Sequence, residues 1–243
     1  ADMLFLRALV QHLEALARIG LEPEERVRRL EAALAIYSQA LDARWHFYEC
    51  WMLLSRCQLD RGMIDQAIGN FEVGLSVYPK DPLVHAFLGE ALVGAAERSE
   101  AAGRPDAATH RSAAAARLDR ALELAPGHVP ALLARARLRA GRDLAGATAD
   151  AGRALEANPR SPQTLTLLAL LRLAGGDVEG ALHAASQSIE LRSDGWEVYA
   201  LRGQIHERRG DPRRAKTDYQ KALKLFPPPD QAKRLGERVE SIE

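Results

Sequence analysis

The chain has 243 residues, 47% of them hydrophobic, which is the proportion of an ordinary folded protein with a continuous core. Lys plus Arg and Asp plus Glu both number 33, so the formal net charge is zero and no overall field attracts nucleic acid or anionic lipid. No apolar run approaches the roughly 18 to 20 residues of a membrane helix. We therefore expect a soluble protein that neither binds nucleic acid nor inserts into a membrane.

Helical periodicity dominates the chain, and no segment alternates with period two over a useful length. The first predicted helix covers about residues 3–19, and Gly20 ends it. Pro23 begins a second helix that reaches about Ala43. The apolar face of the first helix consists of Leu6, Leu9, Val10, Leu13, Leu16 and Ala17.

The segment 48–81 carries a set of landmarks that recurs about every 34 residues up to the C-terminus. A bulky wedge, an apolar partner, a turn glycine, a small contact residue, an aromatic residue and a closing proline follow one another in it. These residues are Trp51, Leu54, Gly62, Ala67, Phe71 and Pro79. The spacing predicts helix pairs at 48–81, 82–127, 128–161, 162–195 and 196–229, after a degenerate pair at 1–47.

Two cysteines, Cys50 and Cys57, lie seven residues apart on one predicted helix. At a rise of about 1.5 Å per residue their separation is about 10 Å, which is beyond disulfide reach. We expect free thiols that fill a helix interface as small hydrophobic groups. Free thiols favour a reducing compartment, so we expect a cytoplasmic location, with the periplasm as the alternative if a signal peptide has been removed.

The unit 82–127 is 12 residues longer than the others, and the additional residues lie where its two helices meet. Gly103 and Pro105 mark the turn, and Asp106 is a candidate N-cap. The alanine-rich flanks predict that both helices grow by about six residues into a projecting hairpin, rather than into an irregular loop. Its candidate contact residues are Arg98, Glu100, Arg104, Asp106 and His110, and a tolerated length variation is the alternative.

The C-terminal segment 230–243 follows three prolines and predicts a short capping helix. Asp230 is its expected N-cap, and Leu235, Val239 and Ile242 form a single apolar stripe. Such a helix covers the apolar end of the last repeat, because a terminal unit has no further neighbour.

The landmarks resemble the tetratricopeptide repeat pattern W-x2-LG-x2-Y…A-x3-F…A…P. In 48–81, Ser55 and Gln58 depart from the pattern. In 196–229, Arg202 stands where the pattern has leucine. That second unit matches at Tyr199, Gly203, His206, Gly210, Ala215, Tyr219, Ala222 and Pro227. The resemblance implies an all-α, right-handed α-solenoid of about six helix pairs with a C-terminal capping helix.

In this family the first helix of each pair lines a concave groove, and the resemblance implies which residues face it. They are Met52, Arg56, Leu59, Ala86, Glu90, Val93, Leu132, Ala136, Arg139, Thr166, Leu170, Leu173, Gln204 and Glu207. The lysines and asparagines with which some family members grip acidic chaperone C-termini are absent from these places. We expect the groove to take an amphipathic helix or an apolar extended segment on Leu132, Leu170 and Leu173. Alternatively, the superhelical curvature or a second copy of the chain buries these leucines.

The sequence contains none of the common catalytic, nucleotide-binding or metal-binding motifs. His85 and His206 occupy aromatic places of the repeat, so we interpret them as packing residues and expect no metal or cofactor. We therefore predict a non-catalytic scaffold or adaptor that binds a protein or peptide, with a homo-oligomer as an open possibility. Two alternatives are a bacterial envelope-biogenesis assembly factor, of the cytochrome c maturation or polysaccharide export type, and a sensory domain of a larger regulator.

Overall fold

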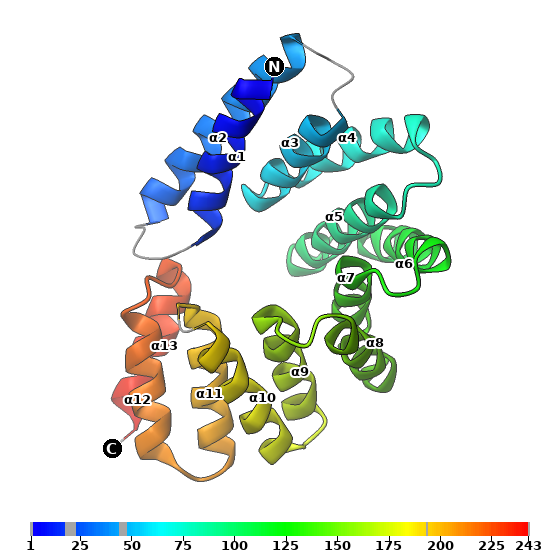
Figure 1. The fold of residues 1–243 in the computed structure, drawn as a ribbon. Helices are drawn as coiled ribbons and strands as arrows, with labels where there is room; N and C mark the ends of the chain where they lie inside the picture. The colour runs from blue at the N-terminus through cyan, green and yellow to red at the C-terminus, as the bar shows by residue number, and fades with distance from the viewer. Residues whose placement is uncertain (1, 18–22, 44–47, 193, 243) are drawn as a thin grey trace. The chain divides into compact units, whose positions relative to one another are not determined.

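The computed structural model describes residues 2–17, 23–43, 48–192 and 194–242, which form helices and short connections without a strand. Figure 1 shows these helices in chain order. The chain divides into two compact units, residues 1–138 and 139–243, and each is described by itself. The predicted all-α class is confirmed.

Unit 1 is a series of antiparallel helices in which α1 to α6 pack in chain order, each on the one before it. Its core between α1, α2 and α3 combines small alanines with Leu30, Tyr37, Cys50, Leu54 and Cys57. The helices are α1 (Asp2–Ala17), α2 (Pro23–Ala43), α3 (Tyr48–Asp60), α4 (Ile64–Val77), α5 (Pro82–Ala101), α6 (Ala107–Leu124) and α7 (Val129–Arg139), of which Arg139 already belongs to unit 2.

The buried face of α1 is not the one expected from its leucines. Ala8 and Ala15 are fully buried, and Leu4 and Phe5 pack against the same core. Leu6, Val10 and Leu13 of the predicted face are instead 53%, 52% and 56% exposed. The helix has two apolar stripes, and the one with small residues packs on α2 because alanine allows a closer approach of two helices. The predicted end at Gly20 lies outside the described residues.

The landmarks of the 48–81 segment occupy the places that the pattern predicts. Gly62 has a φ of 83° in the turn between α3 and α4, a conformation that residues with a side chain rarely adopt. Ala67 and Phe71 of α4 are 0% and 1% exposed. Trp51 is partly buried. Asp81 then accepts a hydrogen bond from the backbone N–H of Leu83 and caps α5.

The helices α5 and α6 have 20 and 18 residues, whereas the preceding pair, α3 and α4, has 13 and 14. The additional residues of this segment therefore continue the two helices, more in α5 than in α6. Gly103, with a φ of 63°, forms the turn between them. Asp106 stands at the N-cap position of α6, but its side chain makes no capping hydrogen bond.

Unit 2 repeats the same construction with regular spacing. Its helices are α8 (Leu144–Ala157), α9 (Pro162–Ala174), α10 (Val178–Leu191), α11 (Trp196–Arg208), α12 (Pro212–Leu223) and α13 (Pro229–Ser241). Asp143, Asp177 and Asp211 each cap a second helix by accepting a hydrogen bond from the backbone N–H three residues later. The predicted cap Ser161 accepts one from the N–H of Thr164, whereas Ser193 lies outside the described residues.

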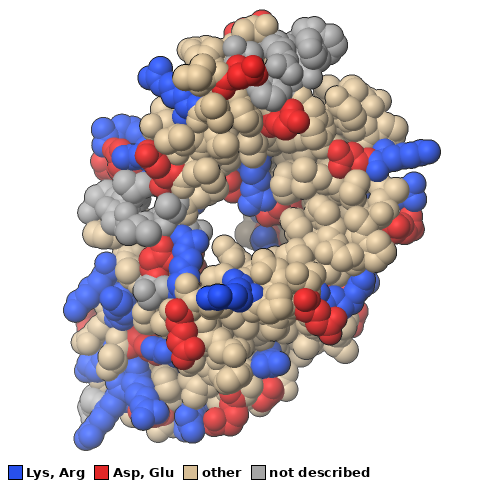
Figure 2. All heavy atoms as spheres, in the orientation of Figure 1, with Lys and Arg blue, Asp and Glu red and all other residues tan. Residues whose placement is uncertain are grey.

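The C-terminal helix α13 packs on α12, and its apolar stripe joins the core of unit 2. Leu235 and Ile242 are 7% and 8% exposed there, and Val239 packs beside them. Asp230 is not the N-cap, because the helix already begins at Pro229. The neighbouring α12 carries four basic residues and one acidic residue, and Figure 2 shows Lys and Arg side chains gathered over this part of unit 2.

Candidate partner-binding surfaces

Six of the predicted groove residues lie in the core rather than on a surface. Each is at most 6% exposed, so a partner cannot reach it in this conformation. They are Met52, Ala86, Val93, Leu132, Ala136 and Leu173. Leu132 and Leu173 are two of the three leucines that we expected to anchor a partner. Burial by the protein itself, which was the stated alternative, therefore describes these two leucines.

The remaining groove residues of unit 1 form a polar network along successive first helices. Arg56 of α3 donates hydrogen bonds to Asp60 on its own helix and to Glu90 of α5, which stands 34 residues further on. Leu59, which precedes Asp60 on α3, is partly buried. The guanidinium of Arg56 also lies 5.5 Å from the ring centroid of Phe87, a cation–π arrangement. These polar side chains are satisfied within the protein, so a ligand would have to displace existing partners.

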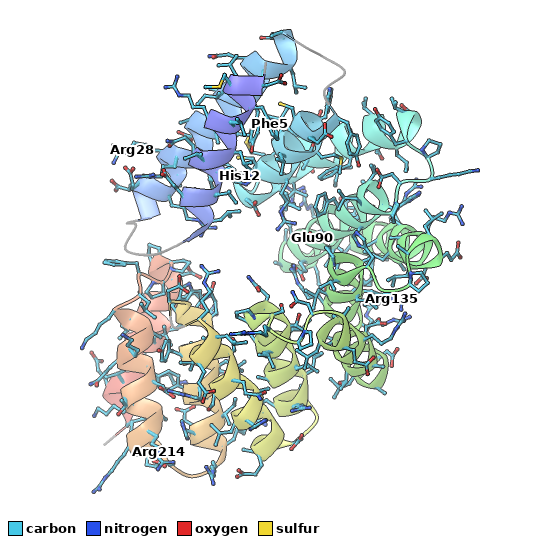
Figure 3. The ribbon with its side chains drawn as sticks, in the orientation of Figure 1. Phe5, His12, Arg28, Glu90, Arg135 and Arg214 are labelled. Atoms are coloured by element: carbon cyan, nitrogen blue, oxygen red, sulfur yellow. The ribbon has the colours of Figure 1, made fainter. Side chains whose placement is uncertain are left out.

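The same network continues into α1 through His12, which the sequence analysis did not single out. His12 is 2% exposed, and its Nε2 lies 3.1 Å from Oδ2 of Asp60. Its Nδ1 lies 3.4 Å from the hydroxyl of Tyr37. Figure 3 shows His12 and Glu90 at the two ends of the network. Three first helices, α1, α3 and α5, are thus connected by side-chain hydrogen bonds.

The ionisation of Asp60 reflects this environment. Burial by itself opposes the charged form of the carboxyl, but the hydrogen bond from His12 and the charge of Arg56 outweigh it. The pKa of Asp60 is therefore lowered from its ordinary value of 3.8. The carboxylate form is part of the folded structure of unit 1.

Unit 2 differs from unit 1, because α9, the first helix of a pair, presents an apolar side chain to solvent. Leu170 is 47% exposed, although most leucines of α9 are buried. Thr166, one turn earlier, donates to the carbonyl of Pro162 and lies 2.9 Å from the Oγ of Ser188. Gln204, the equivalent of Leu170 on α11, is exposed, and Glu207 lies 3.5 Å from Arg238. The first-helix face of unit 2 therefore consists of Leu170 with polar neighbours.

Arg139 of α7, which was also predicted to face the groove, points its guanidinium to the second helix α8. It donates to Asp150, which is 2% exposed, over 2.9 Å. The arginine neutralises a buried carboxylate, and its removal would leave that charge uncompensated and destabilise the fold. Arg139 therefore has a structural role in unit 2.

The hairpin residues of α5 and α6 fall into two groups. Arg98 pairs with Asp65 of α4, and Glu100 accepts from Arg111 within the hairpin. Arg104 is exposed, whereas Asp106 and His110 are partly buried. All of the ion pairs have at least one exposed partner, and such pairs contribute about 0 to 1 kcal/mol. The hairpin surface is thus charged and accessible at Arg104.

Sequence reasoning missed a pocket in unit 2 between α10, α11 and α12. Arg202 donates two parallel hydrogen bonds to Asp218, of 2.8 and 2.7 Å, and His206 lies one turn after Arg202. A signal was present, because Arg202 stands where the repeat pattern has leucine. An arginine at an apolar place requires a buried partner, and Asp218 is 5% exposed.

The cysteines behave as expected from the sequence. Cys50 and Cys57 are free and fully buried, and their thiols donate to the carbonyls of Tyr37 and Leu30. Burial raises the pKa of Cys50 to about 11 and that of Cys57 to about 12, so neither is a nucleophile at neutral pH. Among the residues with described positions, no group of three potential ligands could hold a metal ion. Within the same part of the chain, no helix is long and apolar enough to cross a membrane.

Comparison with known proteins agrees with the repeat spacing. Two tetratricopeptide repeat models match the chain, one over residues 27–91 and the other over 196–229. No curated protein matches it.

Solved structures share the fold at low sequence identity. A chain of the APC/C hetero-tetramer Cut9-Hcn1 superposes with a TM-score of 0.73 and 15% identity over 97% of this chain, which spans 46% of that one. For pilF of Pseudomonas aeruginosa the TM-score is 0.63 at 15% identity, with 80% of this chain and 83% of that chain covered. YrrB, described as a TPR protein with an unusual peptide-binding site, gives 0.52 at 11% identity, with 83% and 97% covered.

The turn glycines, the buried small and aromatic residues of the second helices, the two family matches and the shared fold all agree. The chain therefore contains tetratricopeptide repeats at residues 27–91 and 196–229 and shares the fold of solved tetratricopeptide repeat structures.

Proposed function

We propose that this protein is a non-catalytic scaffold that binds a segment of a partner protein along the first helices of unit 2, with Leu170 as the apolar anchor. The exposed side chain of Leu170 carries this proposal. A leucine that is 47% exposed, on a helix where most other leucines are buried, contributes little to the fold, and it offers a partner an apolar contact.

The surroundings of Leu170 suit a helical or extended peptide. Gln204, at the equivalent place on α11, is exposed and can bond to the backbone or polar side chains of the segment, whereas the hydroxyl of Thr166 already bonds to Pro162 and Ser188. Peptide-binding grooves combine an apolar anchor with a few polar groups that fix orientation. The buried Leu173 and Leu132 are not part of this revised surface.

The similar structures support the general role. Cut9 is part of a hetero-tetramer with Hcn1, and YrrB is described by its peptide-binding site. Tetratricopeptide repeat proteins generally act as scaffolds for other proteins, and burial raises the pKa of both cysteines of this chain. An interaction role therefore accounts for the fold without any reaction chemistry.

The test is capture of partner proteins from the native host with the wild type and two variants. Leu170→Glu should abolish capture of the specific partners, because a charged side chain cannot enter an apolar contact without a large desolvation cost. Val73→Glu, at a 51% exposed valine of α4 on a second helix, is the matched control and should retain capture. Circular dichroism checks that both variants remain folded. Equal capture by the wild type and Leu170→Glu would contradict the proposal.

A further inference from the structure

Unit 2 contains a polar pocket of about 350 Å³ between α10, α11 and α12. That volume is at the lower end of small-ligand sites, which range over about 300 to 1,000 Å³. The pocket lies on the side of α11 that faces the second helices, so it is distinct from Leu170 on α9. Its polar lining residues are Ser186 of α10, Arg202 and His206 of α11, and Arg214, Thr217 and Asp218 of α12.

One of these side chains, His206, has a buried nitrogen that bonds to no described residue. His206 is only 6% exposed, yet its Nδ1 has no hydrogen-bond partner among the described residues. Its Nε2 lies 3.7 Å from Asp218, too far for a hydrogen bond. Ser186 of α10 is only partly buried, so water can reach its hydroxyl. A buried polar group without a partner is costly, so it indicates a missing ligand or water.

The arginines are arranged to offer further donors. Arg202 uses Nε and Nη2 for its two hydrogen bonds to Asp218, which hold the guanidinium in one orientation, and its Nη1 donates to none of the described residues. Arg214 pairs with Asp211 at 3.4 Å with its side chain 67% exposed. An exposed pair of this kind contributes little to stability, so Arg214 can turn to a ligand.

The electrostatic surroundings favour an anion. Asp218 neutralises Arg202, and Arg214 adds a positive charge that pairs with the partly buried Asp211. Arg213, Lys216 and Lys221 on the same helix raise the local potential further. Figure 2 shows Lys and Arg side chains gathered over this part of unit 2. Figure 3 shows Arg214 near the start of α12, with its side chain directed outward.

We propose that this pocket binds a phosphate group. The unused donors come from three helices on different sides of the pocket, which matches the tetrahedral oxygens of phosphate. A carboxylate prefers a coplanar pair of donors, and Asp218 already occupies the fork of Arg202. The phosphate is either free inorganic phosphate or a phosphorylated side chain of a partner.

Binding is measured from the ring signals of His206 in proton–carbon NMR spectra, with His206→Gln used to assign them. Burial lowers the pKa of His206, opposed by the charge of Asp218, while Arg202 and Arg214 lower it and Asp211 raises it. The imidazole is therefore neutral at pH 7, and a bound phosphate should shift its signals in a saturable way. The titrants are sodium phosphate, phosphoserine and acetate at constant ionic strength.

The matched variants separate a built site from a general charge effect. Arg214→Gln should raise the Kd for phosphate about tenfold, since it removes one charge-assisted hydrogen bond. Arg213→Gln removes the same charge from the neighbouring position, which does not line the pocket, and should change the Kd less than about twofold. Equal weakening by both variants, or no saturable shift of the His206 signals in the wild type, would overturn the proposal.

The three titrants distinguish free inorganic phosphate from a phosphorylated side chain of a partner. Tighter binding of phosphoserine than of inorganic phosphate assigns the pocket to a phosphorylated partner residue, and the reverse order assigns it to free phosphate. Acetate that binds as tightly as phosphate would refute phosphate recognition. Leu170→Glu should leave all of these affinities unchanged, so failure of the peptide-binding proposal and failure of this one are separate results.

Discussion

Gly203 in the middle of α11 permits a close approach of α12, and its replacement by alanine should reveal this contact. A Cβ atom added at Gly203 would lie 2.5 Å from Cε1 and 2.7 Å from Cδ1 of Tyr219. Tyr219 is 1% exposed, so its ring has no free space into which to move. Overpacking of this kind costs about 1 to 3 kcal/mol, against which the better helix propensity of alanine recovers about 1 kcal/mol.

The control is Gly152→Ala in the interior of α8 in the same unit. A Cβ atom there meets nothing within 4 Å, so the substitution should stabilise unit 2 by up to about 1 kcal/mol. The two identical substitutions should therefore differ by about 1 to 3 kcal/mol, with opposite directions of the shift in urea midpoint. Far-UV circular dichroism during urea unfolding measures both midpoints.

The contact can also be tested by relieving it. If the ring of Tyr219 is the obstacle, Gly203→Ala should be less damaging in a Tyr219→Leu background than in the wild type, since the two positions are coupled. Equal urea midpoints for Gly203→Ala and Gly152→Ala, or an unchanged effect of Gly203→Ala in the Tyr219→Leu background, would refute the reasoning.

Two further predictions concern buried charges. Arg202→Leu should destabilise unit 2 by up to about 3 kcal/mol in urea unfolding, because it leaves the carboxylate of Asp218 buried and unpaired. The double variant Arg202→Leu with Asp218→Ala recreates Leu168 and Ala184 of the preceding repeat and should recover most of the loss; a double variant as unstable as the single one would contradict this account. The pKa of Asp60 is lowered in the folded state from its ordinary value of 3.8. Its carboxylate therefore stabilises unit 1 fully at pH values above 3.8, and this stabilisation is lost as the pH falls through the lower folded-state pKa. Between about pH 5 and 3 the wild type should therefore lose stability more steeply than Asp60→Asn, whereas Asp65→Asn, at a surface pair, should follow the wild type; parallel curves for the wild type and Asp60→Asn would show that Asp60 is not responsible.

The predicted groove shows that the sequence pattern could not decide which side of a helix is covered. Leu170 and Leu173 lie three residues apart on α9, and the repeat pattern predicted that both face a partner. One is 47% exposed and the other is 6% exposed, because the angle at which neighbouring helices pack decides which stripe of a helix is covered. The same ambiguity affected α1, where the stripe of Ala8 and Ala15 is buried instead of that of Leu6, Val10 and Leu13.

The pocket of unit 2 was unpredictable for a related reason. Arg202 and Asp218 are 16 residues apart on different helices, and no local rule connects them. The departure of Arg202 from the leucine of the pattern indicated a special position, but neither the partner nor the neighbouring His206 and Ser186 could be assigned from spacing. Side chains from three helices meet there through packing, which a one-dimensional pattern does not contain.

The amino-acid sequence by itself determined the repeat, the helix pairs and their turns. These depend on local chemistry: Gly62, Gly176 and Gly210 adopt positive φ values of 83°, 84° and 78° at the turns, and small residues such as Ala67 and Ala215 are fully buried at the helix contacts. The tertiary structure decided which side chains remain available to other molecules. Exposure of Leu170, burial of Leu132 and the pairing of Arg202 with Asp218 are set by non-local packing, since each depends on residues of another helix.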